Sequence, residues 1–208
     1  MEAGHAAPAR CPRVGMPALR VAVLRDLQVS RHGEAAALCP AMGEGEGEGM
    51  MWRESHRADP SGAVLADRHY NRQHPGSRQF VPPGRCFVLV AYSPATAVWV
   101  TSWPFEEYTK HAWAGAWVNS LFRREGGNLA SEMIRAAVAA TLWKWGNPPA
   151  LGMITFVDET KIQNKRNAGY CYIKAGFKRA GRTKGGLLAL QILPEDMPDP
   201  VAPLGVLL

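Results

Sequence analysis

The feature of this sequence that most limits its possible folds is a long amphipathic stretch between two apolar ones. In residues 129–145, LASEMIRAAVAATLWKW, apolar side chains recur every three or four positions, as in a helix with one buried face. The runs AGAWVNSLF (114–122) and ALGMITFVD (150–158) on either side have the length and composition of buried strands. A strand, a helix and a strand in this order predict a sheet that the helix covers.

The segments before this unit extend the pattern. CFVLVAYS (86–93) and AVWVTSW (97–103) are two further strands with a short turn between them, which predicts an antiparallel hairpin. A helix is expected over residues 59–72, with Asp59 as its N-cap and Pro60 at its first position.

A second helix, KIQNKRNAGYCYIKAG (161–176), and a last strand, GGLLALQIL (185–193), follow the unit. The expected order is therefore helix, three strands, helix, strand, helix, strand. This order predicts an α+β fold with a mixed, mainly antiparallel twisted sheet and helices on both faces.

The first 50 residues differ in composition from the rest. They are rich in Ala, Gly and Pro and end in the low-complexity repeat GEGEGEGM, which offers few side chains to bury. We expect residues 1–50 to be disordered, residues 51–196 to form one domain and residues 197–208 to form a tail. Translation from Met50 or Met51 would produce that domain alone.

Positive charge is concentrated after residue 50. Of the 24 Lys and Arg and the 18 Asp and Glu residues, the first 50 positions hold 5 and 6, which leaves a net charge of +7 on the rest. Residues 160–186 carry eight Lys and Arg and no acidic residue. Such a run favours a polyanionic partner, although it could also be a solvated surface. The candidate DNA contacts are Lys165, Arg166, Lys178, Arg179, Arg182 and Lys184.

The sequence gives little support for a membrane, secreted, metal-binding or disulfide-rich protein. No apolar run approaches the roughly 18 residues of a membrane span, and no secretory signal is recognisable, so a cytoplasmic protein without a membrane partner is expected. The four cysteines are scattered without a C-x-x-C pair, which indicates neither a metal site nor a disulfide framework.

The segment RREGGNLA joins the third strand to the long helix. Two glycines at the start of a helix can expose backbone amides to an anion, and two arginines add positive charge. A tight turn would need the same glycines, and Asn128 or Ser131 could serve only to cap the helix. The candidate phosphate ligands are Arg123, Arg124, Gly126, Gly127, Asn128 and Ser131.

A strand, Arg-x-x-Gly, a helix, a strand and a helix that ends in YIKAGF resemble the GNAT superfamily of N-acyltransferases over residues 52–193. The resemblance implies that acetyl-CoA or another acyl-CoA binds with its pyrophosphate at the turn. It also implies that Tyr172, four residues before Gly-Phe, is the general acid for the departing thiolate. The sequence departs from the family at Asn128, where the family has Gly or Ala.

Within the superfamily, GYCYIKAGF (169–177) is similar to the Mom-type DNA-modification proteins of phages. RHYNR (68–72), VNSLF (118–122) and VDET (157–160) are similar to further segments of these proteins. This resemblance implies modification of adenine in DNA at its exocyclic amine, which protects phage DNA from restriction. Ser120 stands where the Mom-type proteins carry an arginine, and their long basic C-terminal extension is missing.

Acyl transfer to an amine also needs a base and donors that polarise the thioester carbonyl. The strand WVNSLF has no Glu, so Asp158 and His69 are the candidate bases, with Asn119 and Ser120 as further candidates on the strand. Asp158 could instead cap the next helix, and His69 could be a core or surface residue.

Three functions remain open: a DNA acyltransferase, an ordinary N-acetyltransferase of a small-molecule or protein amine, and a non-enzymatic nucleic-acid binder on a degenerate GNAT scaffold.

Overall fold

The computed structural model describes residues 51–92, 95–161 and 167–204. The N-terminal segment 1–50 and the basic candidates Lys165 and Arg166 lie outside these residues.

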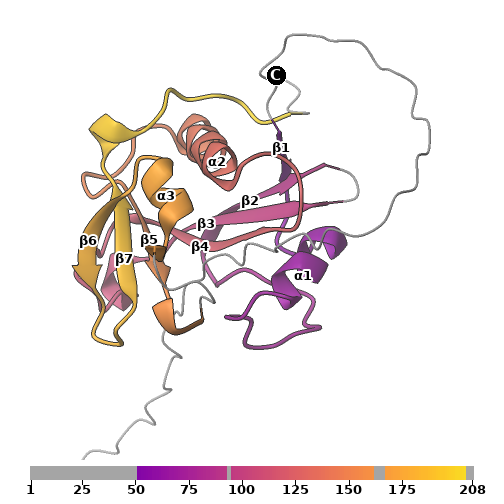
Figure 1. The fold of residues 1–208 in the computed structure, drawn as a ribbon, viewed down its shortest axis with the longest axis horizontal. Helices are drawn as coiled ribbons and strands as arrows, with labels where there is room; N and C mark the ends of the chain where they lie inside the picture. Colours follow the sequence, from indigo (N-terminus) through magenta and orange to yellow (C-terminus); the bar gives the residue numbers. More distant parts are fainter. Residues whose placement is uncertain (1–50, 93–94, 162–166, 205–208) are drawn as a thin grey trace, which may run out of the picture.

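Seven strands form one open sheet in the order β1-β2-β3-β4-β5-β7-β6 (Figure 1). Neighbouring strands are antiparallel except β4 and β5, which are parallel. The sheet is therefore mixed and mainly antiparallel, as the sequence predicts. Its strands are β1 Trp52–Ser55, β2 Arg85–Ala91, β3 Ala97–Trp103, β4 Trp117–Arg124, β5 Met153–Val157, β6 Lys178–Arg182 and β7 Leu188–Ile192.

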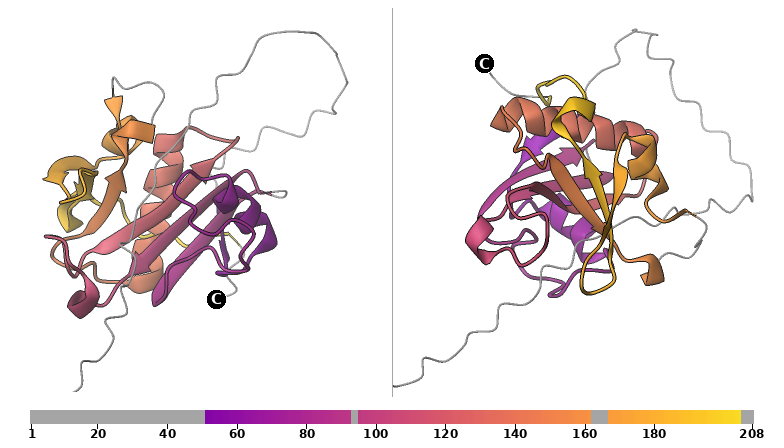
Figure 2. Two further views of the ribbon diagram at one scale, coloured as in Figure 1. Left: turned by 90° about the horizontal axis from the view of Figure 1, so that it is seen from below. Right: turned by 90° about the vertical axis from the view of Figure 1, so that its left-hand side faces the viewer.

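Three α-helices pack against this sheet, and Figures 1 and 2 show α2 and α3 on one face and α1 on the other. They are α1 Pro60–Asp67, α2 Ala130–Trp145 and α3 Tyr170–Lys174. Short 3-10 turns lie at Glu106–Tyr108, Glu159–Lys161 and Pro194–Asp196. Within the described residues, no helix is long and apolar enough to cross a membrane.

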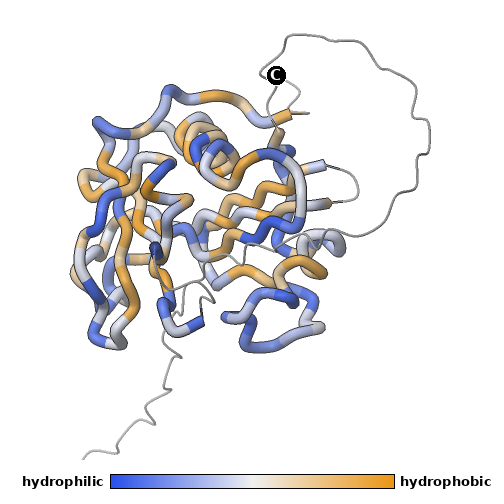
Figure 3. Tube along the Cα trace, viewed as in Figure 1, coloured by the Kyte–Doolittle hydropathy of each residue, from blue (hydrophilic) through white to orange (hydrophobic). Residues whose placement is uncertain are grey.

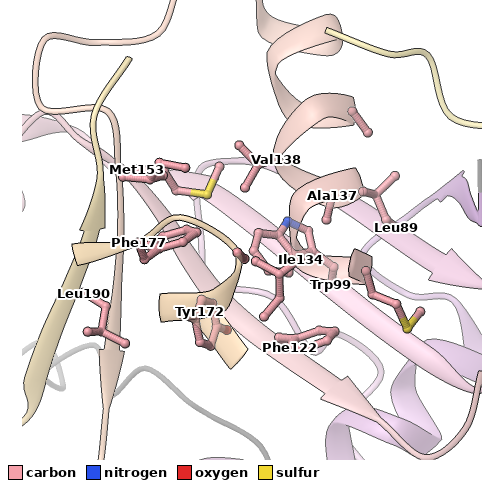
Figure 4. Packing of buried hydrophobic residues seen from close by; sticks show 14 of the residues in the cluster. Leu89, Trp99, Phe122, Ile134, Ala137, Val138, Met153, Tyr172, Phe177 and Leu190 are labelled. Carbon is pink, nitrogen blue, oxygen red and sulfur yellow. The ribbon is translucent and has the colours of Figure 1, made fainter. Parts of the chain in front are cut away.

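The main core lies between the sheet and the two helices α2 and α3. The apolar stripe of α2 supplies Met133, Ile134 and Ala137, and the strands add large side chains such as Trp99 and Phe122, all fully buried (Figure 4). A smaller cluster beneath α1 forms on the opposite face, around Val88, Val90, Val98 and Val100. Figure 3 shows the central strands as hydrophobic and the loop after α1 as hydrophilic.

The first helix is shorter than its sequence predicts. Asp59 caps it, because its side chain accepts a hydrogen bond from the backbone of Gly62, but the helix ends at Asp67 instead of residue 72. Arg72 pairs with Asp67 and donates to the carbonyls of Ser77 and Gln79, which holds the following segment as a loop. His69 therefore lies just after the helix.

Two strands at the edges of the sheet were not expected. β1 pairs with β2, and β6 pairs with β7 inside the basic run. The expected helix over residues 161–176 is also wrong in its extent among the described residues: a 3-10 turn ends at Lys161, and α3 spans five residues, Tyr170–Lys174.

Residues 197–204, expected as a tail, run across α2 to the β1 edge. The amide of Val201 donates to the carbonyl of Ala139 in α2, and the amide of Leu204 donates to the carbonyl of Trp52. Leu204 also forms a parallel bridge with Arg53, so this segment lies against the outer edge of β1.

Candidate functional site

The two parallel strands pair over only three residues. Trp117, Val118 and Asn119 of β4 face Met153, Ile154 and Thr155 of β5. β5 stays paired with β7 along its whole length, and β4 stays paired with β3 as far as Arg124. The strands therefore diverge after the Asn119–Thr155 pair, and we call this point the β4–β5 divergence.

Tyr172 of α3 reaches this divergence from the helical face of the sheet. Its hydroxyl donates to Asn119 Oδ1 at 2.6 Å, and the Thr155 hydroxyl lies 3.3 Å from the same oxygen. Asn119 Nδ2 donates to the carbonyls of Val100 and Leu121, at 3.1 and 3.0 Å. Because both amide hydrogens are used in this way, the amide oxygen must face the tyrosine. The Tyr172 hydroxyl therefore donates its single proton to Asn119 Oδ1.

The surroundings of Tyr172 are apolar. The side chain is fully buried, and its ring packs against Trp99, Phe122 and Phe177 (Figure 4). This burial raises the pKa of the hydroxyl well above its usual value of 10, with a smaller contribution from Cys171. Tyr172 is therefore protonated at neutral pH, as a general acid must be, but its hydroxyl faces the core and is bonded to Asn119.

Tyr170 lies on a different side of α3. Its side chain is 52% exposed, and the Lys174 ammonium lies 5.6 Å from its ring centre. The two tyrosines of the segment therefore have different environments: Tyr172 is buried at the β4–β5 divergence, and Tyr170 is on the surface.

Both arginines of the β4–α2 turn, predicted as phosphate ligands, make hydrogen bonds within the protein. Arg123 pairs with Glu125 and donates through Nη1 to the carbonyl of Arg68, at 2.8 Å. Arg68 in turn pairs with Glu125 at 2.6 Å. Arg124 belongs to β4, and its Nη1 lies 3.5 and 3.3 Å from the carbonyls of Gly127 and Asn128. Both guanidinium groups thus hold the turn itself.

The two glycines of the turn have different requirements. Gly127 has φ +85°, and a methyl group there would lie 2.6 Å from the ring of Tyr92. Gly126 is in an ordinary conformation, and a methyl group there would meet Thr96 at 3.6 Å, which is normal contact. Only Gly127 is therefore required by the backbone and its neighbours.

Tyr92 is a part of this turn that the sequence does not indicate. It follows β2 with φ +67°, which is unusual for a residue with a side chain. Its hydroxyl donates to Asn128 Oδ1 at 2.6 Å, so Asn128 does not cap α2. The N-cap residue of α2 is Leu129, which makes no side-chain bond, and Ser131 lies in the first turn. The first amides of this 16-residue helix therefore have no side-chain cap.

No protein-family model, curated protein or solved structure matches this chain. The function is therefore inferred from the chain's own residues. Among the residues that the structure describes, no three His, Cys, Asp or Glu side chains are grouped as metal ligands.

The two candidate bases occupy different environments. Asp158, which follows β5, accepts hydrogen bonds from the amide and hydroxyl of Thr160 at 3.0 and 2.6 Å, and so caps the 3-10 turn that begins at Glu159. His69 is only 4% exposed. Its burial, with the positive charge of Arg123 beside it, lowers the pKa of the imidazole from 6.5 to about 3.

The hydrogen bonding of His69 does not favour a role as a base. Its Nδ1 accepts a hydrogen bond from the Asn71 amide at 3.1 Å. A neutral imidazole whose Nδ1 accepts carries its proton on Nε2, so its one basic lone pair, on Nδ1, is already engaged by the Asn71 amide. In this environment His69 is placed to donate a hydrogen bond through Nε2.

Ser120 is the extra residue of a bulge between β3 and β4, where the pairing shifts between Val100 and Thr101. Its hydroxyl donates to the carbonyl of Val100 at 3.4 Å, a long contact. The bulge brings Asn119 and Phe122 to the same face, where each contacts Tyr172.

Residues 178–184 of the basic run form the edge strand β6 and the start of the turn after it. Although the run itself has no acidic residue, the fold brings two carboxylates to it: Lys178 pairs with Asp196 and Arg182 pairs with Glu159. Arg179 and Lys184 are exposed. The charge available to a polyanion is thus smaller than the sequence implies, and charges on an edge strand also prevent pairing with other chains.

Proposed function

We propose that this chain is an acyl-CoA-dependent N-acyltransferase that acts on an exocyclic amine of DNA, with adenine as the modified base. The observation that carries the proposal is the β4–β5 divergence with the Tyr172 hydroxyl at its last residue pair. The strand order, with a single parallel pair between β4 and β5, agrees with the fold expected from the resemblance to the GNAT superfamily. In that arrangement the thioester would lie between the diverging strands.

The proposed reaction joins the amine nitrogen to the acyl carbon and breaks the carbon–sulfur bond, and the proton that the amine nitrogen loses passes through solvent to restore the one that the thiolate takes. The thiolate that leaves needs a proton, and the Tyr172 hydroxyl is a buried donor at the divergence. A thiolate is charged and accepts a hydrogen bond more strongly than the neutral amide oxygen of Asn119. Rotation of the hydroxyl from Asn119 to the sulfur would therefore be favourable once the thiolate forms.

The start of α2 supports the binding of the cofactor phosphates. Its first amides have no side-chain cap, and the positive end of a 16-residue helix favours an anion. Gly126 lies in the turn four residues before the first residue of α2 and tolerates a side chain, since a methyl group there makes only normal contact.

Acetyl-CoA titration by calorimetry tests this site. Gly126→Glu adds a carboxylate and should weaken binding by about tenfold or more. Gly126→Ala is the matched control and should bind within about twofold of the natural protein. Equal affinity in all three proteins would contradict the assignment of the turn.

DNA binding is supported by the net charge of +7 after residue 50 and by the exposed side chains of Arg179 and Lys184. Arg179→Glu and Lys184→Glu should each flatten the dependence of log affinity on log salt, by about 0.9 for every phosphate that the protein no longer binds. Arg53→Glu, on the opposite edge strand β1, is the control. A slope that these substitutions leave unchanged would remove DNA from the proposal.

The reaction itself is tested by mass spectrometry of nucleosides from the DNA of cells that express the chain. A modified deoxyadenosine that disappears in Tyr172→Phe would support the proposal. Unmodified nucleosides in the presence of measured acetyl-CoA binding would exclude DNA as acceptor.

A second candidate is a nucleic-acid binder without catalysis. The observation in its favour is the state of two expected site residues: Tyr172 is fully buried, and Arg123 is bound to Glu125 and Arg68. DNA binding without any acetyl-CoA binding would decide for this function.

A further inference from the structure

The outward side of α3 carries an exposed aromatic ring next to a cation. Tyr170 and Lys174 lie one turn apart on this helix, on the side away from the buried Tyr172, and both are exposed. The Lys174 ammonium lies 5.6 Å from the centre of the Tyr170 ring. The ring is therefore accessible to a ligand and has a positive charge beside it.

A β-bulge in β6 brings two arginines to the same face of the sheet as α3. Residues three apart in a regular strand lie on opposite faces, but the pairing of β6 with β7 shifts between Arg179 and Gly181. Arg179 is thereby opposite Leu190, and three residues later Arg182 is opposite another leucine of β7. Both leucines belong to the main core under α2 and α3. Because residues directly opposite each other in an antiparallel pair share a face, both arginines lie on the α3 face.

Tyr170 and Arg179 adjoin the same leucine. A methyl group on Gly169, the residue before Tyr170, would lie 2.3 Å from the Leu190 side chain, so the start of α3 packs on Leu190. Arg179 pairs with Leu190 from β6, is exposed, and has no ion pair with any side chain that the structure describes. We call Tyr170, Lys174 and Arg179 the α3–β6 strip.

The α3–β6 strip adjoins the β4–β5 divergence. The same methyl group on Gly169 would lie 3.4 Å from Val157 of β5, and Tyr172 bonds to Asn119 of β4. The helix thus lies between the β6 edge and the divergence (Figure 1). A chain molecule bound along the strip would reach the proposed site.

We infer that the α3–β6 strip binds single-stranded DNA, with one base stacked on Tyr170 and neighbouring phosphates on Lys174 and Arg179. An unpaired base offers its π face to an aromatic side chain, whereas the bases of a duplex are stacked on one another and offer only their edges. This inference rests on the proposed function for DNA as the partner, and it adds the state of the strand. The acceptor base would be supplied by a reaction that separates or displaces strands, so that its amine is unpaired.

The test compares the binding of three labelled probes to the full chain by fluorescence anisotropy. They are an oligodeoxyadenylate of about 12 nucleotides, a strand of the same length with abasic residues throughout, and the duplex of the first strand with its complement. The abasic strand has the same phosphates without the bases. We expect the oligodeoxyadenylate to bind about tenfold more tightly than the abasic strand, and more tightly than the duplex, because stacking adds to the phosphate contacts.

Substitutions separate stacking from charge. Tyr170→Ala should weaken binding of the oligodeoxyadenylate by about tenfold and leave the abasic strand within about twofold, whereas Tyr170→Phe keeps the ring and should bind as the natural protein does. Arg179→Ala should weaken binding of both strands by the same factor, because it removes only a phosphate contact. Phe105→Ala is the control: this ring is 65% exposed in the loop after β3, and its loss should change neither affinity.

The inference is wrong if the duplex or the abasic strand binds as tightly as the oligodeoxyadenylate, or if Tyr170→Ala leaves the affinity unchanged. In these cases DNA remains the partner in the proposed function, and only the state of the strand is wrong. Polyglutamate that competes as well as the oligodeoxyadenylate would overturn the inference in favour of an acidic protein. If none of the three probes binds while acetyl-CoA does, DNA is wrong as the acceptor and the inference fails with it.

Discussion

Replacing Tyr172 by phenylalanine separates its place in the core from its proposed chemistry. The substitution keeps the ring and its contacts with Trp99, Phe122 and Phe177, whose centres lie 5.2–6.4 Å away. It removes one buried hydrogen bond of 2.6 Å and leaves Asn119 Oδ1 with the Thr155 hydroxyl at 3.3 Å.

A neutral buried hydrogen bond contributes about 0.5–1.5 kcal/mol, and an acceptor left with a poor partner adds to the loss. The free energy of unfolding should therefore fall by about 1–2 kcal/mol. For a domain of this size, that corresponds to a lower melting temperature by about 2–8 °C. If Tyr172 protonates the thiolate, turnover should fall further than stability explains, by about 10²-fold or more.

Three measurements on the same preparation test this prediction: urea unfolding, acetyl-CoA affinity and the rate of thiol release. Tyr170→Phe is the matched control, because its ring is on the surface, and it should change all three little. A Tyr172→Phe protein that loses stability as expected but keeps its turnover would refute the acid role and leave the residue as part of the core.

The stability of the protein above pH 10 is an independent test of the same hydroxyl. The pKa of Tyr172 is raised in the folded state, so above pH 10 the unfolded chain loses this proton more readily and unfolding becomes easier. The natural protein should lose more stability above pH 10 than Tyr172→Phe does, and parallel pH profiles would contradict the buried environment.

Two further predictions concern stability. Gly127→Ala should lower the free energy of unfolding by at least about 1 kcal/mol, because φ is +85° and the methyl group meets Tyr92. Gly126→Ala should lower it by less than half as much, and equal losses in urea unfolding would refute the described turn. The pKa of His69 is about 3 in the folded protein, so between pH 7 and pH 5 the unfolded chain takes up a proton that the folded one does not. About 2 kcal/mol of stability should be lost over this range and regained in His69→Gln, and an identical pH dependence of the two proteins would show that His69 is not buried in its neutral form.

The central part of the fold could be predicted because its apolar pattern is strong. The strand over residues 97–103 has the predicted bounds, and α2 begins at residue 130, one residue after its predicted start. The edge strands WRES and KRAGR were missed because neither has the apolar alternation of a half-buried strand. Their pairing comes from neighbours distant in the sequence.

Prediction of the candidate site was limited in the same way, by contacts between residues distant in the sequence. The sequence indicated Tyr172 and the glycine turn, which are local motifs. It could not indicate that Glu159 and Asp196 would neutralise two cations of the basic run, because these ion pairs join separate elements. Tyr92 was missed for a similar reason, since its role depends on a left-handed backbone and on contact with Asn128, 36 residues later.

The segment that ends at Leu204 has a consequence for synthesis of the chain. β1 is the first described strand, and its outer edge is covered by the last described residues, which the Arg53–Leu204 bridge brings from the far end of the domain. During translation β1 can pair with β2 early, but its other edge stays uncovered until residue 204 has left the ribosome. A nascent or truncated chain would thus present the Trp52 carbonyl to solvent and to neighbouring nascent chains, and a fusion joined directly after residue 204 would bring its bulk to the same edge.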